Sequence, residues 1–368
     1  MRGVYVHVPF CAHKCDYCDF YSVAGYLDLV DAYIQAIITE ASRYKGLHFD
    51  TLYLGGGTPS MLGANNKLVT LIKNIKNTLD IKQLTEATIE VNPDSALPEL
   101  FEAALNNGIN RISIGVQSLN DEELKRVSRI HSAEQALSAI HAAAAAGFQR
   151  ISADVIIGLP GQTTRTLRET LSGLISLPVQ HISTYCLSLE HETPLALHPP
   201  SDLPSDDDQA DLFVQASDFL KDAGLVHYEI SNFARPGCQC LHNLNYWRGG
   251  EYVGLGPAAA SHLHGRRYKN IADLPGYIND PSNGIEDCEE LTGEKKLGED
   301  AILRLRLLAE GLDINDIRSR YDEDSVNALM GRLDALIDEG YLSFDGAAYR
   351  LSSPAVLISN SVLCRILP

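Results

Sequence analysis

The 368-residue sequence is poor in basic residues and has no long apolar runs. Its 30 Lys and Arg are outnumbered by 48 Asp and Glu, so the formal net charge is −18. Such a charge repels nucleic-acid phosphates unless a local basic stripe overcomes it, and no run of Lys and Arg is present. No apolar segment has the length of a membrane span, and the N-terminus shows no signal peptide. We therefore expect a cytoplasmic protein with no nucleic-acid partner.

Cysteine, in contrast, is plentiful and unevenly distributed. Eight cysteines are present, and three of them fall within the segment CAHKCDYC that begins at Cys11. In a reducing compartment, cysteines are more often thiolates, ligands or buried small residues than disulfides. The clustered cysteines therefore need an explanation of their own.

Short apolar runs alternate with longer amphipathic segments over the first two thirds of the chain. Alternation of this kind predicts a parallel sheet with helices between its strands. Six strand–helix units are too few for a closed eight-stranded barrel, so we expect an α/β fold with a partial (βα)6 barrel that binds ligands at the carboxyl ends of its strands. The predicted strands are VYVHV, DTLYLG, ATIEVN, RISIGV, RISADVIIGL and HISTYCLS.

The predicted helices occupy the segments between these strands. They are the stretch around 28–43, the segments after Asn65, Ser95 and Thr164, and the Ala-rich stretch that ends at Gly147. Glycine is common just after a helix because it adopts the left-handed conformation there without strain. Gly147 therefore marks the expected end of its helix.

Three regions follow from the pattern: the barrel at 1–235, a connecting segment at 236–290 and a small domain at 291–368. The last region has two short predicted helices followed by GYLSFDGAAYRLS, in which two strand-like runs meet at Asp345-Gly346. Helices followed by a hairpin are typical of a winged helix. Because no basic recognition helix is present, we expect this domain to pack or to dock a partner rather than to bind DNA.

The cysteine segment has the spacing C-x₃-C-x₂-C and comes directly after the first strand. Structural zinc normally takes four ligands, whereas three thiolates around a four-iron cluster leave one iron open to a small molecule. We therefore predict a [4Fe-4S] cluster on Cys11, Cys15 and Cys18. The alternatives are a zinc site with His7 or His13 as the fourth ligand, or three unrelated thiols.

Further polar residues follow the ends of successive strands. The second strand ends in GGGTP, whose glycines at 55–57 let backbone amides approach a ligand closely. Glu90, Gln117 and Asp154 lie at or in the next three predicted strands, and Arg129 follows the fourth strand. Carboxylates accept hydrogen bonds from ribose hydroxyls, and the guanidinium pairs with carboxylates. Each residue is commonplace alone, but together they predict a ligand site.

The three-cysteine spacing is that of the radical S-adenosylmethionine (SAM) superfamily, which this chain resembles over its first two thirds. The resemblance implies that the open iron binds the amino and carboxylate groups of SAM. It also implies that an electron from a donor splits a carbon–sulfur bond of the sulfonium to give a 5′-deoxyadenosyl radical.

Within this superfamily, the segments YVHVPFCAHKCDYCDF, IEVNPD, SADVIIGLPGQT and HNLNYWRGGEYVGLGPAAASH resemble the oxygen-independent coproporphyrinogen dehydrogenases and their relatives. The likeness covers nearly the whole chain. In that group, SAM is bound at positions that correspond here to Tyr5, Gly57, Thr58, Glu90, Gln117, Arg129 and Asp154.

Two departures separate this chain from the dehydrogenases themselves. Phe20 stands where they carry a further cysteine, and only ten residues precede Cys11, where they have a long arm. The motif HNxxYW at 242–247 instead resembles the signature of the haem chaperone family HemW. That family implies haem as cargo, haem-requiring client proteins as partners, and no coproporphyrinogen dehydrogenase activity. The resemblance does not decide whether the protein forms a homodimer.

Two interpretations of the HNxxYW motif remain. His242 offers a neutral imidazole to haem iron, with Tyr246 and Trp247 as flat apolar faces for the porphyrin. Alternatively, His242 and Asn243 cap the interface between the barrel and the C-terminal domain, with the single Trp as its core. The nearby Cys238 and Cys240 either hold a metal, help to bind haem, or have no ligand role.

The leading functional hypothesis is therefore a haem chaperone that carries a [4Fe-4S] cluster and SAM. The main alternative is a coproporphyrinogen III dehydrogenase that decarboxylates propionate side chains to vinyl groups. A radical RNA-modifying enzyme would share the cluster loop, but the acidic charge and the lack of a basic domain argue against it.

Overall fold

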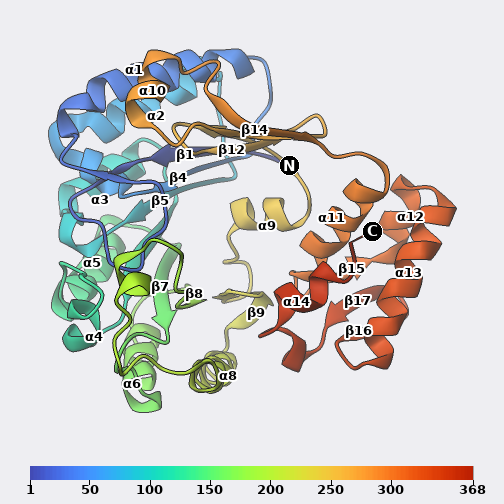
Figure 1. Ribbon diagram of the computed structural model, residues 1–368. Helices are drawn as coiled ribbons and strands as arrows, with labels where there is room; N and C mark the ends of the chain where they lie inside the picture. The colour runs from blue at the N-terminus through green and yellow to red at the C-terminus, as the bar shows by residue number, and fades with distance from the viewer. Residues whose placement is uncertain (368) are drawn as a thin grey trace.

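The computed structural model describes residues 1–367, and its main feature is a 12-stranded sheet that curves around one side of the molecule (Figure 1). Six parallel strands form its centre in chain order. They are β1 (Arg2–Val8), β4 (Thr51–Gly56), β5 (Glu86–Val91), β6 (Arg111–Gln117), β7 (Ile151–Ile157) and β8 (His181–Cys186). These are the six predicted strands, and the sheet does not close on itself. The partial barrel is therefore confirmed.

Helices cover the outer side of this curved sheet (Figure 1). The longest of them, α5, starts at Ser132, where Ser132 and Gln135 form a reciprocal capping box, and it ends at Gly147 in the left-handed conformation (φ 108°). The predicted end at Gly147 is thus correct. The covering helices are α1 (Val30–Ala41), α2 (Lys67–Thr78), α3 (Pro98–Asn106), α4 (Asp121–Lys125), α5 (Ala133–Ala146) and α6 (Thr164–Ile175).

The sheet extends beyond the six predicted strands at both edges. Next to β8 lie two antiparallel strands, β10 (Asn232–Ala234) and β9 (Val226–Glu229), and α8 (Asp206–Asp222) precedes them. Next to β1 lies the parallel strand β11 (Glu251–Leu255), followed by three antiparallel strands. Those three are β12 (Ala260–Leu263), β13 (Arg266–Asn270) and β14 (Ile285–Glu290). Much of the expected connecting segment therefore belongs to the sheet.

A short helix on the inner side of the sheet, α9 (Leu241–Trp247), carries the HNxxYW motif. It contacts β1, β4 and β11 and lies between the sheet and the C-terminal domain (Figure 1). The fully buried carboxylate of Glu86 on β5 accepts hydrogen bonds from the amides of Leu241 (3.1 Å) and His242 (3.0 Å), and Arg150 pairs with it at 3.4 Å. The carboxylate therefore satisfies the otherwise unpaired N–H groups at the start of α9.

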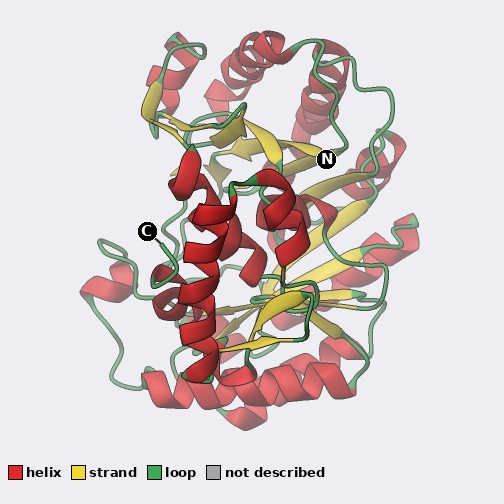
Figure 2. Cartoon of the chain, turned by 90° about the vertical axis from the view of Figure 1, so that its right-hand side faces the viewer, coloured by secondary structure: helices red, strands yellow, loops and turns green. Residues whose placement is uncertain are grey.

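The C-terminal domain packs against this helix. Its core contains α11 (Gly293–Leu305), α12 (Ile314–Arg320), α13 (Glu323–Asp338) and a three-stranded sheet in the order β15 (Leu312–Asp313), β17 (Ala348–Leu351), β16 (Leu342–Phe344). The predicted hairpin at Asp345-Gly346 is confirmed, and the arrangement resembles a winged helix. Figure 2 shows the helices of this domain in front of the sheet.

None of the helices in residues 1–367 is both long and apolar enough to span a bilayer.

We expect Glu86→Ala to lower the free energy of unfolding by about 3 kcal/mol, because the change leaves two helix-terminal N–H groups and Arg150 without their buried partner. Denaturant titration measures this loss. Glu286→Ala, which removes an exposed carboxylate from β14, is the control and should change stability by less than about 0.5 kcal/mol. Equal stabilities of the two variants would contradict the proposed capping role.

Candidate cluster and ligand site

The cysteine loop begins where β1 ends and is attached there to the turn after β4. Gly57 N–H donates to the carbonyl of Val8 and Thr58 N–H to that of Phe10, both at 2.8 Å. A Cβ on Gly57 would lie 2.9 Å from both of these carbonyl oxygens. Only glycine therefore permits this approach without a shift of the backbone.

These contacts correct one expectation about the GGGTP turn. The sequence predicts that its amides face a ligand, but the N–H of Gly57 donates to the Val8 carbonyl and the N–H of Gly56 donates to Glu90 Oε2 at 3.1 Å. The glycines thus position the cysteine loop and a carboxylate.

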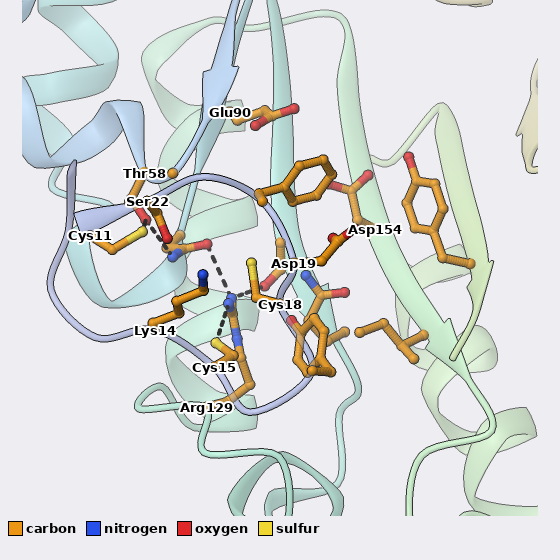
Figure 3. Close-up of a pocket in the computed structure, with 18 of the residues that line it drawn as sticks. Cys11, Lys14, Cys15, Cys18, Asp19, Ser22, Thr58, Glu90, Arg129 and Asp154 are labelled. Carbon is orange, nitrogen blue, oxygen red and sulfur yellow. Dashed lines mark hydrogen bonds between the residues drawn. The ribbon is translucent and has the colours of Figure 1, made fainter. Parts of the chain in front are cut away.

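One cavity of about 340 Å³ lies at the carboxyl ends of the central strands, and nearly all of the predicted site residues line it (Figure 3). Those residues are Cys11, Cys15, Cys18, Gly57, Thr58, Glu90, Gln117, Arg129 and Asp154. Tyr5 and His242 are the exceptions and line the neighbouring cavity, where the Tyr5 hydroxyl lies 3.1 Å from His7 Nδ1. The predicted contact of Tyr5 with SAM stays a prediction.

The three cysteines are free and only partly buried, and two of their sulfurs lie beside polar hydrogens. Arg129 Nη1 donates to Cys15 Sγ at 3.4 Å, and Cys11 Sγ lies 3.3 Å from the hydroxyl oxygen of Thr58. Burial raises the pKa of Cys11 and of Cys18, so in the metal-free protein these groups favour the thiol. Metal binding would release their protons.

The zinc alternative requires His7 or His13 as the fourth ligand. Both ring nitrogens of His7 are engaged, Nδ1 with the Tyr5 hydroxyl and Nε2 with the Tyr21 carbonyl at 2.8 Å. His13 is exposed at the cavity wall. In the described part of the chain, no three His, Cys, Asp or Glu side chains converge as a single-ion site.

Arg129 is held in place by a network that spans two strands. Its Nη2 donates to the carbonyl of Gly115 at 2.8 Å and to Asn92 Oδ1 at 3.1 Å, while Nη1 meets Cys15. Gln117, two residues after Gly115, has a φ of 64°, which is rare for a residue with a side chain. Strained backbone of this kind clusters at ligand sites.

Two carboxyl groups in the wall of the site, those of Glu90 and Asp154, influence each other electrostatically. Glu90 accepts from the Tyr53 hydroxyl at 2.8 Å and from Gly56 N–H, and Asp154 accepts from the Ser113 hydroxyl at 3.1 Å. Burial and the neighbouring charge of Asp154 raise the pKa of Glu90 to about 7. Burial also raises the pKa of Asp154. Both groups are positioned to accept hydrogen bonds from ligand hydroxyls.

A second, wider cavity of about 840 Å³ adjoins the first. The two share Lys14, Asp19, Phe20, Glu90 and Tyr185 in their walls. Of the aromatic residues in this cavity, only Tyr246 and Trp247 are predicted from the sequence as haem contacts. The others come from distant segments, which no local motif connects. The aromatic residues of the second cavity are Tyr5, Phe20, Tyr21, Tyr53, Tyr185, Tyr246, Trp247 and Tyr252.

His242 lies in the wall of this second cavity with both ring nitrogens engaged. Nδ1 lies 2.8 Å from Thr51 Oγ1, and Nε2 lies 2.8 Å from the Tyr246 hydroxyl. Burial, and then the charge of Arg111, lower the pKa of His242 to about 3, so the ring is neutral. Iron ligation by His242 stays a prediction, and it would require one of these two bonds to break.

The other members of the motif lie at the domain interface. Trp247 packs with Leu244 and Leu307, and the Arg306 guanidinium lies 4.7 Å from the Trp247 ring centroid. Asn243 lines the second cavity. The packing of Trp247 agrees with the structural interpretation, whereas the proposed capping by His242 and Asn243 stays a prediction. Cys240 is buried, with its sulfur 3.5 Å from a Glu86 carboxylate oxygen.

Two family profiles match the chain. One, described as the radical SAM superfamily, matches residues 5–173, and the other, the HemN C-terminal domain, matches residues 291–358.

Curated proteins named "Heme chaperone HemW" are similar over nearly the whole chain. The Lactococcus lactis protein is 33% identical over 100% of this chain and 97% of its own length, and the Escherichia coli protein is 33% identical over 98% and 97%. The solved structure of Escherichia coli coproporphyrinogen III oxidase HemN covers 99% of this chain and 89% of its own, with a TM-score of 0.86 at 23% identity. That last similarity is one of fold.

We expect Glu90→Gln to weaken the pH dependence of stability between about pH 4.5 and 7. Because the pKa of Glu90 is raised in the folded state, the stability it contributes is present below its ordinary pKa and is lost as the pH rises towards 7. Denaturant unfolding of the cluster-free protein across this range measures the slope. Glu99→Gln, which changes an exposed carboxylate, should keep the wild-type slope. Identical slopes for wild type and Glu90→Gln would contradict the assignment.

Proposed function

Because the chain belongs to the HemW family of haem chaperones within the radical SAM superfamily, we propose that it carries a [4Fe-4S] cluster and SAM and delivers haem to haem-requiring proteins. The observation that carries this proposal is the pair of adjoining cavities at the carboxyl ends of the strands. One is lined by three thiols, and the other is wide and aromatic.

The residues of the first cavity fit an iron–sulfur cluster. Three thiols on one loop leave one iron without a protein ligand, and that position suits the amino and carboxylate groups of SAM. The Arg129 guanidinium beside Cys15 and the Thr58 hydroxyl beside Cys11 provide hydrogen-bond donors that stabilise negative charge on sulfur. When bound, the cluster and SAM supply reductive cleavage of a carbon–sulfur bond.

The remaining predicted residues of this cavity suit the polar groups of SAM. Glu90 and Asp154 offer carboxylate oxygens to ribose hydroxyls, and Gln117 offers an amide that both donates and accepts. Gly57 and Thr58 hold the turn against the cysteine loop.

The second cavity suits a flat, apolar ligand that carries negative charge at its edge. Aromatic walls would bury the faces of a porphyrin, and the cations Lys14 and Lys269 in the same wall suit two propionates, whereas Arg267 is already paired with Glu289 and Glu299. Glu299 and Leu303 of α11 also line the cavity. A movement of the C-terminal domain would therefore open it, which gives haem a route to a client.

The dehydrogenase remains the second candidate because of its shared fold. Phe20 argues against it. This side chain is 63% exposed and lies in the walls of both cavities, at the position where the dehydrogenases have a cysteine. An electron donor, a homodimer and a cytoplasmic location stay predictions.

The test is anaerobic reconstitution of wild type, Cys15→Ala and Cys186→Ala, followed by addition of haem. Cys186 lines the same cavity but lies at the end of β8, so its variant is a matched control. We expect about four iron and four sulfide per chain in wild type and Cys186→Ala, and less than about half of that in Cys15→Ala. We also expect wild type to bind haem and pass it to a haem-free acceptor protein.

The same samples are then incubated with coproporphyrinogen III, SAM and a reductant. We expect no decarboxylation. Decarboxylation by wild type that is absent from Cys15→Ala would identify the protein as an enzyme of porphyrin synthesis and overturn the chaperone assignment.

A further inference from the structure

The wall of the second cavity contains two buried ring nitrogens that have no hydrogen-bond partner among the described residues. They are Nε2 of His262 and Nε1 of Trp247. Unpaired polar atoms are uncommon in protein interiors because they lose their bonds to water without replacement. Two such atoms in the wall of one cavity indicate that a ligand completes this site.

His262 is held in one tautomer by the chain around it. It lies on β12, is 8% exposed, and its Nδ1 lies 3.3 Å from the carbonyl oxygen of Gly250. A carbonyl only accepts, so Nδ1 carries the proton and Nε2 keeps a free electron pair. Metal-bound histidines commonly donate their other ring nitrogen to a backbone carbonyl in this way.

The other histidines of this cavity lack such a free nitrogen. Both nitrogens of His7 are bonded, to Tyr5 and to the Tyr21 carbonyl. Both nitrogens of His242 also have side-chain partners. Among the described histidines that line the cavity, His262 alone offers an electron pair without first breaking a bond.

We propose that His262 Nε2 is the protein ligand to the iron of haem bound in the second cavity. This inference rests on the proposed haem-binding function. Nε2 is covered by surrounding atoms, so iron ligation would require a rotation of the His262 ring or of a neighbour such as Tyr252, whose ring centroid lies 6.1 Å away. The Trp247 indole N–H, which only donates, suits a propionate carboxylate.

Helix α9, which carries the HNxxYW motif, then acts on the ligand through the backbone, by way of a residue at one of the variable positions of the motif. Asn245 of α9 donates to the carbonyl of Glu251 at 2.9 Å, and a Cβ on Gly250 would lie only 2.1 Å from Asn245 Oδ1. The helix therefore fixes the position of the Gly250 carbonyl, which in turn orients His262. Asn245 is a positioning residue, and His262 is the ligand.

The test is titration with ferric haem of the cluster-loaded wild type and of His262→Gln, His242→Gln and His264→Gln. His264 is exposed, lies two positions away and is outside the cavity wall, so it is a matched control. Dissociation constants come from the visible absorbance, and electron paramagnetic resonance reports the axial ligand. We expect His262→Gln to bind haem about tenfold or more weakly and to lose the imidazole signature, which added imidazole should restore. His264→Gln should keep both properties, and His242→Gln should keep the imidazole signature.

His262→Met provides a second readout that does not depend on loss of binding. Methionine fills the same buried position and should change the ligand signature from imidazole to thioether. Circular dichroism and iron content of each variant confirm that the fold and cluster are retained.

The outcomes separate the inference from the function. If wild type binds no haem, the proposed function fails and this inference fails with it. If wild type binds haem and His262→Gln and His262→Met keep the wild-type signature, the inference is wrong while haem binding stands. Loss of the signature in His242→Gln alone would assign the ligand to the HNxxYW histidine.

Discussion

The site depends on the close approach of two backbone segments at the carboxyl ends of β1 and β4. Two hydrogen bonds attach Gly57 and Thr58 to the carbonyls that precede the cysteine loop, and no Cβ fits at Gly57. The same turn presents the Gly56 amide to Glu90 and the Thr58 hydroxyl to Cys11. The cysteine loop, the carboxylate and the strand ends are therefore held in one arrangement.

A second attachment forms the other half of the site. Glu86 on β5 holds the start of α9, which spans the inner side of the sheet and brings His242, Tyr246 and Trp247 to the second cavity. The C-terminal domain packs on the far end of this helix. The two cavities share charged and aromatic side chains in their walls, so a bound haem and a bound SAM would be neighbours.

The sequence predicted the parts of this arrangement that depend on local pattern. Alternation located the six central strands, and Asp345-Gly346 located the hairpin. The three-cysteine spacing, supported by the ends of successive strands, located the first cavity. Parallel strands bring these ends together, so residues far apart in sequence meet there.

Features that depend on distant pairing were not predictable in this way. The amides of Gly56 and Gly57 donate hydrogen bonds to Glu90 and Val8. These two partners lie on other strands, so the local sequence around the glycines does not reveal the bonds. β14 has no buried residue, so its hydrophobic pattern gave no signal. His262 looks ordinary in sequence, and only the contact with Gly250 and the unpaired Nε2 distinguish it.

If SAM and haem occupy the two adjoining cavities as proposed, the protein can hold both ligands at the same time. Simultaneous binding is tested most directly by two titrations of the cluster-loaded protein. In one, haem is added at several fixed concentrations of SAM, and in the other, SAM is added at several fixed concentrations of haem. The account predicts one haem and one SAM per chain, with neither ligand displacing the other. Because coupling between two sites is reciprocal, competition would appear in both titrations. Displacement of each ligand in proportion to the concentration of the other would show a single shared site and contradict the account.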